Sequence, residues 1–369
     1  MHNKNFKTIF DCGFSKLRAG TFNKNNSKEF FYAESEFFFD HKNLDFEIQK
    51  IITSFEKDTD EYINNINLMV DSPKMLSIGI SISKKFDRSI LKQSNIQFLI
   101  QEAKQQILKY YVNYNITHII VNNYKIDNID YSYFPNEIEC QFISLDILFI
   151  CLPSDLVLYF KNIFSKSNIV IDKIICSSYA KSINYRENLN LNEHTSFIDV
   201  GFEKTSIISY DKDKILSLHV LPIGGNHITK DISYILEMEL EQSENIKLNF
   251  DQTLKLSSEK DDSVERLQKI IFARTEEILE LSVKAIESNL LMKGNYKMIL
   301  MGNGSKILDN RHKDKISFSN DIDFLEETLE DICQSGFRLG MGLNKREVLV
   351  VPKKETKQGF FEKLFHFFR

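Results

Sequence analysis

The segment 197–204 reads Phe-Ile-Asp-Val-Gly-Phe-Glu-Lys, and the earlier segment 9–16 reads Ile-Phe-Asp-Cys-Gly-Phe-Ser-Lys. The two segments share the pattern Asp-x-Gly-Phe-x-Lys. In each, an apolar strand delivers an aspartate and a glycine, and a polar turn leads into a second short strand, at 17–22 or at 205–210. The sequence therefore predicts two related β-hairpins, each with an acidic side chain near its turn.

Such a hairpin can hold a phosphate group. The backbone N–H groups of a tight turn bind phosphate oxygens, and a nearby aspartate can hold a hydrated Mg²⁺ ion that neutralises them. Two hairpins that face each other across a cleft would clamp one polyphosphate. The alternative is that Asp-x-Gly is ordinary turn chemistry, which is common in α/β proteins. Two copies in one chain favour the phosphate site.

Glycine is scarce in this chain, so the positions of its glycines are informative. There are 13 glycines in 369 residues, well below the typical share of about 7%. Gly224 and Gly225 precede a predicted helix at about 229–240, and Gly302-Asn303-Gly304-Ser305 follows a predicted strand at 297–301. A helix N-terminus behind a glycine turn favours an anion or a ribose. Both turns are candidate ligand sites, and each alone is also common as a plain structural turn.

Composition and missing motifs exclude several classes of protein. The chain has 47 Lys and Arg against 52 Asp and Glu, which gives no basic field for nucleic acid. Its five cysteines form no C-x-x-C pair, and H-E-x-x-H, G-x-S-x-G and P-loop patterns do not occur. No apolar run approaches the roughly 20 residues that span a bilayer, and the start lacks a signal peptide. The sequence thus predicts a cytosolic globular protein of about two domains, or of one large fold with an insertion.

The order of the motifs resembles the actin-like ATPase superfamily and, within it, the FtsA family of bacterial cell-division proteins. Residues 11–16 and 199–205 look like the two phosphate motifs, 222–229 is similar to the family pattern P-x-G-G-x-x-I-T, and 302–305 is similar to the adenosine motif. Matches to two further helical patterns of the family fall on Leu240, Glu244, Ile246 and Lys247, and on Arg274, Glu277 and Ile278.

The resemblance implies an α/β fold of the actin-like, two-lobed type, a duplicated ribonuclease H-like core with an inserted small α/β subdomain. It also implies ATP and Mg²⁺ as ligands, with the ion held through water by Asp11 and Asp199. No catalytic residue is assigned. The nucleotide-binding residues that it implies are Asp11, Gly13, Ser15, Lys16, Asp199, Gly201, Thr205, Gly224, Gly225, Asn226, Glu244, Lys247, Gly302, Gly304 and Ser305.

The second phosphate motif departs from the family pattern D-I-G-G-G-T-T-D. Gly201 is followed by Phe202, Glu203 and Lys204, so two glycines are lost and Glu203 adds negative charge near the expected phosphates. Ser177 stands where relatives carry the acid or amide that positions the attacking water, and a serine is a poor general base. The groups that would position this water against the γ-phosphate are missing. We therefore expect that the protein retains a nucleotide cleft but hydrolyses ATP slowly at most.

The resemblance also predicts how the chain divides. The insertion at 77–168 reads as a compact α/β unit by its own pattern, with strands at 77–82, 117–121 and 142–152 and helices at 93–111 and 155–164. A long helix is predicted at 263–291, preceded by a loop at 251–262. The predicted subdomains are 1–76 with 169–194 (1A), 77–168 (1C), 195–225 with 295–350 (2A) and 226–294 (2B), followed by a tether at 351–358 and a terminal helix at 359–369.

The last eleven residues predict an amphipathic helix. On a helical wheel, its apolar side chains cover an arc of about 160°, and its length of about 15 Å is half of a bilayer core. Lys353, Lys354 and Lys357 add attraction to anionic lipid. Without the resemblance, docking onto protein and membrane binding are equal alternatives; with it, the segment looks like a membrane-targeting helix. Its lipid-facing residues would be Phe360, Phe361, Leu364, Phe365, Phe367 and Phe368.

By resemblance, the protein would polymerise and tether FtsZ filaments to the cytoplasmic face of the cytoplasmic membrane at the division site. The FtsZ C-terminal peptide would bind the 2B subdomain, self-association would use the insertion, and the other partners would be divisome proteins and anionic lipid, with no nucleic acid. One alternative is an actin-like phosphotransferase, which needs a catalytic acid beside the phosphates where Ser177 stands. The other is an actin-like adaptor of a pilus or secretion machine, whose tail would not bind the membrane.

Overall fold

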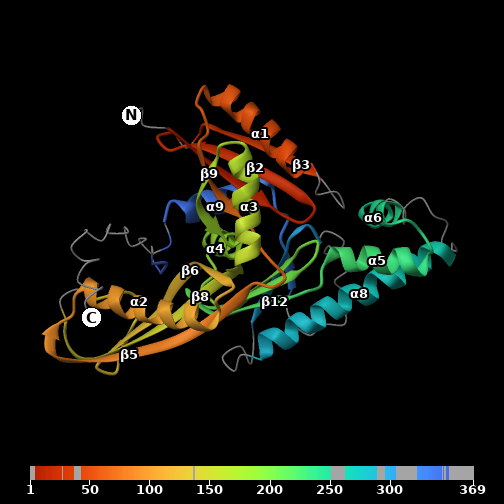
Figure 1. Ribbon diagram of the computed structural model, residues 1–369. Coiled ribbons are helices and arrows are strands. Elements are labelled where there is room, and N and C mark those ends of the chain that lie inside the picture. Colours follow the sequence, from red (N-terminus) through yellow and green to blue (C-terminus); the bar gives the residue numbers. More distant parts are fainter. Residues whose placement is uncertain are drawn as a thin grey trace, which may run out of the picture.

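A computed structural model gives the architecture of the protein. It describes residues 5–26, 28–36, 43–135, 138–250, 262–288, 296–304, 322–342, 344 and 346–348. Three separate sheets and the helices around them make up the described part (Figure 1). The tether, the terminal helix, the loop at 251–261 and Ser305 lie outside the described residues.

The first sheet is built on the first Asp-x-Gly hairpin. Strands β1 and β2 pair antiparallel, with Asp11 opposite Arg18, and β3 continues the antiparallel order beyond β2. On the other side of β1, strands β4 and β9 run parallel to it. The sheet order is β3-β2-β1-β4-β9. Its strands are β1 (Phe6–Cys12), β2 (Lys16–Asn23), β3 (Phe30–Glu36), β4 (Asn65–Met69) and β9 (Val170–Ile175).

The second sheet repeats this plan. Strands β10 and β11 form an antiparallel hairpin that β12 extends, while β13 and β14 run parallel on the other side of β10. The order β12-β11-β10-β13-β14 matches the first sheet strand for strand. The duplication predicted from eight residues therefore extends over two five-stranded sheets. The strands are β10 (Thr195–Val200), β11 (Thr205–Asp211), β12 (Lys214–Leu221), β13 (Lys297–Met301) and β14 (Ile322–Phe324).

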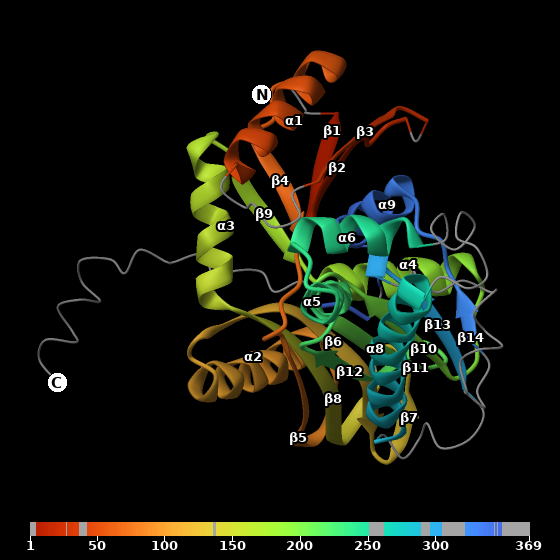
Figure 2. The same ribbon diagram turned by 90° about the vertical axis from the view of Figure 1, so that its right-hand side faces the viewer.

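The insertion forms its own sheet and core. Strands β5 and β6 both pair antiparallel with the long central strand β8, and helix α2 covers the sheet with its apolar face (Figure 2). That face repeats at helical spacing through Ile96, Leu99, Ala103 and Ile107. These three strands and α2 each overlap an element predicted from the sequence, whereas the short strand β7, which pairs with β6, was not predicted. Their bounds are β5 (Leu76–Ile90), α2 (Gln93–Tyr110), β6 (Tyr114–Ile126), β7 (Ile129–Tyr131) and β8 (Glu139–Pro153).

Helix α3 (Ser154–Lys166), which the sequence groups with the insertion, packs instead on the first sheet. Phe164 meets Phe10 of β1 edge to face, with ring centroids 5.2 Å apart. Val157, Phe160 and Ile163 join the same core, on which α1 (Leu44–Thr59) also packs. The core of the insertion thus ends near Pro153, because the apolar stripe of α3 is buried against the first lobe.

Two helices cross between the lobes. Helix α4 (Ser177–Asn188) follows the first sheet and contacts β11 of the second, and α9 (Leu329–Gly340) follows the second sheet but packs on β1, β2 and β4 of the first. The two helices also pack against each other. The chain therefore passes twice between the lobes, and the cleft lies where α4 begins.

The small unit of the second lobe consists of α5 (Gly225–Ile235), α6 (Leu240–Leu248) and α8 (Asp262–Glu287), with a core of its own. The prediction of one helix at 229–240 was wrong at both ends. Gly224 is in extended conformation at the N-cap, so α5 begins at Gly225, and Glu237 has a left-handed φ of 50°, which separates α5 from α6. Among the described residues, no helix is both long and apolar enough to cross a membrane.

Candidate functional site

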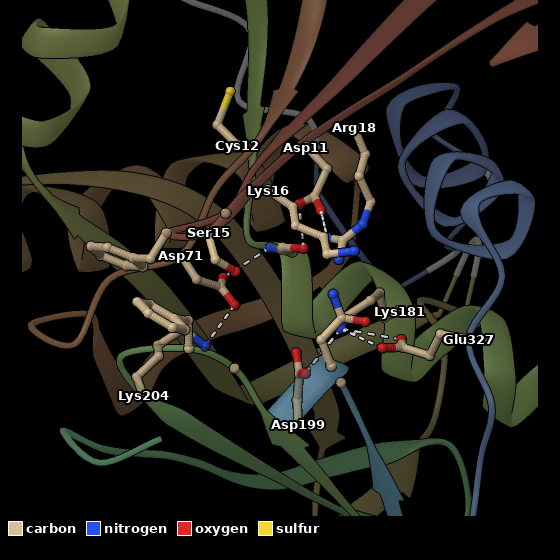
Figure 3. A pocket seen from close by; sticks show the side chains of 17 residues that line it. Asp11, Cys12, Ser15, Lys16, Arg18, Asp71, Lys181, Asp199, Lys204 and Glu327 are labelled. Carbon is tan, nitrogen blue, oxygen red and sulfur yellow. Dashed lines mark hydrogen bonds and ion pairs between the residues drawn. The ribbon is translucent and has the colours of Figure 1, made fainter. Parts of the chain in front are cut away.

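The turns of the two hairpins meet at one pocket between the lobes (Figure 3). The turn after β1 contributes residues 13–16, and the turn after β10 contributes Gly201, Phe202 and Lys204. Both turns close with the same hydrogen bond, from Gly13 N–H to the Lys16 carbonyl at 2.9 Å and from Gly201 N–H to the Lys204 carbonyl at 2.8 Å. Among the predicted nucleotide-binding residues, those that line this pocket are Asp11, Gly13, Ser15, Lys16, Asp199, Gly201 and Gly302.

Asp11 is held from two sides within the first lobe. Nη1 of Arg18, its cross-strand partner, donates to Oδ2 at 3.0 Å, and the Ser177 hydroxyl donates to Oδ1 at 2.8 Å. Burial of Arg18 lowers the pKa of its guanidinium, but attraction to Asp11 and Glu34 outweighs burial and raises that pKa overall. Both carboxylate oxygens of Asp11 therefore already have a protein donor.

Asp199 pairs with a lysine from the start of α4. The Nζ atom of Lys181 lies 2.9 Å from Oδ1 of Asp199 and 3.1 Å from Oε1 of Glu327, and all three side chains are at most 8% exposed. Burial lowers the pKa of Lys181, but its two carboxylate partners more than offset this and raise the pKa above its ordinary value. Lys181 is therefore a permanent cation between two acids of the second lobe.

Asp71 joins the lobes and caps helix α4. Its carboxylate accepts hydrogen bonds from the N–H groups of Ser177 and Ser178 at 2.9 and 3.1 Å, and it pairs with Nζ of Lys204 at 2.8 Å. Burial raises the pKa of Asp71, but Lys204 and the hydrogen bonds outweigh burial and lower that pKa to about 2. The second hairpin is thereby fixed to the N-terminus of α4.

The remaining predicted residues that the structure describes belong to the second lobe and do not line this pocket. The Thr205 hydroxyl donates to the Ile223 carbonyl at 2.8 Å. Lys247 donates to Glu244 at 2.6 Å and to the Gly225 carbonyl at 3.1 Å, in a buried network with Thr229. Lys247 therefore has protein partners, and its burial lowers its pKa.

The start of α5 is joined to the second phosphate turn. Gly225 N–H donates to the Gly201 carbonyl at 2.9 Å, and Asn226 N–H donates to the Phe202 carbonyl at 2.7 Å. A side chain at Gly224 would collide with the same two carbonyl oxygens, and Gly302, whose φ is +93°, and Gly304 approach Val200 equally closely. The three glycine loops thus stack on one another in the second lobe.

Glu203 does not itself line the pocket, although its neighbours Phe202 and Lys204 do. Its carboxylate accepts a hydrogen bond from the Asn226 amide at 2.5 Å. The side chain that takes the inward position is Lys204, the repeat counterpart of Lys16.

Several charged residues of the pocket escaped the sequence reasoning. Lys204 could have been found, because it is the last residue of the shared Asp-x-Gly-Phe-x-Lys pattern. Asp71 follows an apolar strand, but many residues do so, and this position alone does not indicate a site. Arg18, Lys181 and Glu327 belong to none of the motifs that the sequence analysis used. The missed residues are Arg18, Asp71, Lys181, Lys204 and Glu327.

The duplicated sheets and the crossing helices, with the hairpin turns facing one pocket, show that this chain has the actin-like ATPase fold. The solved structure described as the PilM-PilN type IV pilus biogenesis complex superposes with a TM-score of 0.63 over 93% of this chain and 99% of that chain. Its sequence is 14% identical, so the likeness concerns the fold.

Sequence comparison is more specific. The family described as cell division protein FtsA matches residues 196–348. The cell division protein FtsA of Buchnera aphidicola subsp. Acyrthosiphon pisum (strain APS) is 24% identical over 350 residues, covering 83% of this chain and 82% of that protein. Its counterpart from Buchnera aphidicola subsp. Schizaphis graminum (strain Sg) is 22% identical over 314 residues, covering 77% and 72%. The chain is thus similar to FtsA proteins over most of its length.

Proposed function

We propose that this actin-like cell-division protein polymerises and tethers FtsZ filaments to the cytoplasmic face of the membrane at the division site. The observation that carries the proposal is the match of residues 196–348 to the FtsA family within an actin-like fold. The tail sequence at 359–369 supports the membrane end of the tether, because its apolar residues share one helical face.

The small unit of α5, α6 and α8 is the proposed binding surface for the FtsZ C-terminal peptide. Two large apolar side chains at the end of α5 support this: Tyr234 is 87% exposed and Ile235 is 55% exposed. Leu240 at the start of α6 is partly exposed near them in sequence. Adjacent exposed apolar side chains are typical of a surface that a partner covers.

The cleft is the proposed site for the phosphates of ATP, with at most slow turnover. The hairpin turns, Lys16 and Lys204 supply the groups that hold phosphate. Ser177 takes the place of the water-positioning acid or amide, and its hydroxyl donates to Asp11, which leaves the cleft without a general base at that position. An ATP titration with Asp199→Ala as the comparison variant tests this: equal affinities, or no binding to either, would exclude the nucleotide role.

A pull-down of the full chain with the FtsZ C-terminal peptide tests the central proposal. We expect retention by the peptide and none by a scrambled peptide of the same composition. Absence of retention would exclude FtsZ tethering and favour the adaptor alternative, provided that circular dichroism shows the chain to be folded. The outcome does not depend on whether nucleotide binds.

A further inference from the structure

The cleft of this protein carries its own counter-charges. Four acidic side chains line it, and each one has a cationic partner within the same pocket: Asp11 pairs with Arg18, Asp71 with Lys204, and both Asp199 and Glu327 with Lys181. In each of these pairs, both side chains are at most 12% exposed. Three cations of the protein itself therefore compensate most of the charge of these four carboxylates.

A hydrated Mg²⁺ ion does not fit this arrangement. Such an ion needs carboxylate oxygens free to accept hydrogen bonds from its water ligands or to bind it directly. Asp11 has a donor on each oxygen, and Oδ1 of Asp199 receives the ammonium of Lys181. Within the described residues, no group of three or more His, Cys, Asp or Glu side chains is arranged to hold a metal ion.

Displacing Lys181 to admit the ion would be costly. Its ammonium lies within 3.2 Å of Asp199 and of both oxygens of Glu327, in a place with almost no solvent. Separating a buried ion pair leaves charges without compensation, which costs several kcal/mol. The ammonium already provides what a metal ion provides beside a phosphate, namely fixed positive charge between the acids of the cleft.

We propose that Lys181 takes the place of a divalent metal ion in this cleft, so that the cleft binds the polyphosphate of a nucleotide without such an ion. This inference rests on the proposed nucleotide role. Two further lysines line the same pocket. Lys204 comes from the second turn, and Lys16, which is 21% exposed, pairs with Glu34 and Glu36 at the surface and can turn toward a phosphate.

Calorimetric titration of the full chain with ATP, in excess Mg²⁺ and in EDTA, tests the proposal. We expect dissociation constants that agree within about twofold in the two buffers, and we expect inorganic tripolyphosphate to compete with ATP in EDTA. Binding that weakens tenfold or more in EDTA, a loss of about 1.4 kcal/mol, would overturn the inference while leaving the nucleotide role intact. Competition by adenosine but not by tripolyphosphate would also overturn it.

Variants at Lys181 make the test specific. Lys181→Met should lose at least tenfold in affinity in EDTA and recover part of it when Mg²⁺ is added, since Asp199 and Glu327 are then open to the ion. Lys181→Arg should keep metal-independent binding. Lys269→Met is the matched control, because Lys269 pairs with Glu265 on the exposed face of α8. If Lys181→Met does not fold, the wild-type comparison alone decides; no binding of ATP in either buffer would remove both the inference and the nucleotide role.

Discussion

The Nζ atom of Lys204 in the second lobe lies 2.8 Å from Oδ2 of Asp71 in the first, and the two side chains are only 6% and 9% exposed. The pair thus joins the hairpin of one half to the helix N-terminus of the other, across the cleft. We expect Lys204→Met to lower the free energy of unfolding by about 3–5 kcal/mol, because it leaves a buried carboxylate without its cation. Urea denaturation measures this.

The double variant Lys204→Met, Asp71→Asn separates the pair from its surroundings. The double variant should lose less free energy of unfolding than the two single variants lose together, because neither charge of the pair is then left without a partner. Simple additivity would show that the pair contributes no coupling between the lobes. Lys269→Met, on the exposed face of α8, should change stability by less than about 0.5 kcal/mol.

Asp71 also makes the stability of the protein depend on pH in the acidic range. Its pKa is lowered to about 2 from an ordinary value of 3.8, so the charged form stabilises the fold above about pH 4. That contribution is lost as the pH falls from 4 to 2, and it amounts to about 2 kcal/mol. Urea denaturation at a series of pH values measures this. The difference in the free energy of unfolding between wild type and Asp71→Asn should be constant above pH 5 and should become smaller below pH 4. A difference that does not change between pH 5 and pH 2 would contradict the assignment.

Gly336 allows helix α9 to lie close on the first sheet. A Cβ atom there would overlap Met69 of β4 and approach Cγ2 of Ile9 at 2.8 Å. We expect Gly336→Ala to destabilise the protein by about 1–3 kcal/mol through overpacking. Gly79→Ala in β5 is the matched control, since a Cβ atom there has nothing within 4 Å. Thermal unfolding should therefore show a lower Tm for the first variant alone, and equal Tm values would refute the packing argument.

The exposed end of α5 can be tested for partner binding. Tyr234→Lys should weaken retention of the FtsZ C-terminal peptide at least tenfold, because the variant replaces an apolar contact by a charge at the proposed surface. Tyr110→Lys is the control: Tyr110 is 75% exposed but lies on α2 of the insertion. Equal effects of the two variants on peptide affinity would place the binding surface elsewhere.

The tail predicts membrane association. Deletion of residues 359–369 should abolish flotation with liposomes that contain anionic lipid, and Phe365→Glu alone should reduce it, because a charge on the apolar face opposes insertion. Glu362→Gln on the polar face should float like the full chain. Unchanged flotation of the deletion variant would remove the proposed membrane anchor.

Local chemistry made part of the site predictable. The two Asp-x-Gly-Phe-x-Lys turns are formed by residues next to one another in the chain, so the hairpins and six of the pocket residues could be predicted. The buried stripes of α2 and α8 were predictable for the same reason, since periodicity reports which face is covered. The ends of α5 were not, because a left-handed residue at Glu237 has no strong sequence signal.

Two Asp-x-Gly hairpins and a likeness to FtsA proteins could be predicted from the order of residues alone. The electrostatics of the cleft depend on tertiary packing. Lys181 on helix α4 pairs with Asp199 of β10 and with Glu327 before α9. Asp71 pairs with Lys204, which lies 133 residues later in the sequence. Such partners are brought together by the packing of two duplicated sheets about the crossing helices, and a side chain's charge partner across a cleft leaves no periodic pattern in the chain. The pairing of the acids in the cleft with internal cations is therefore a property of the fold.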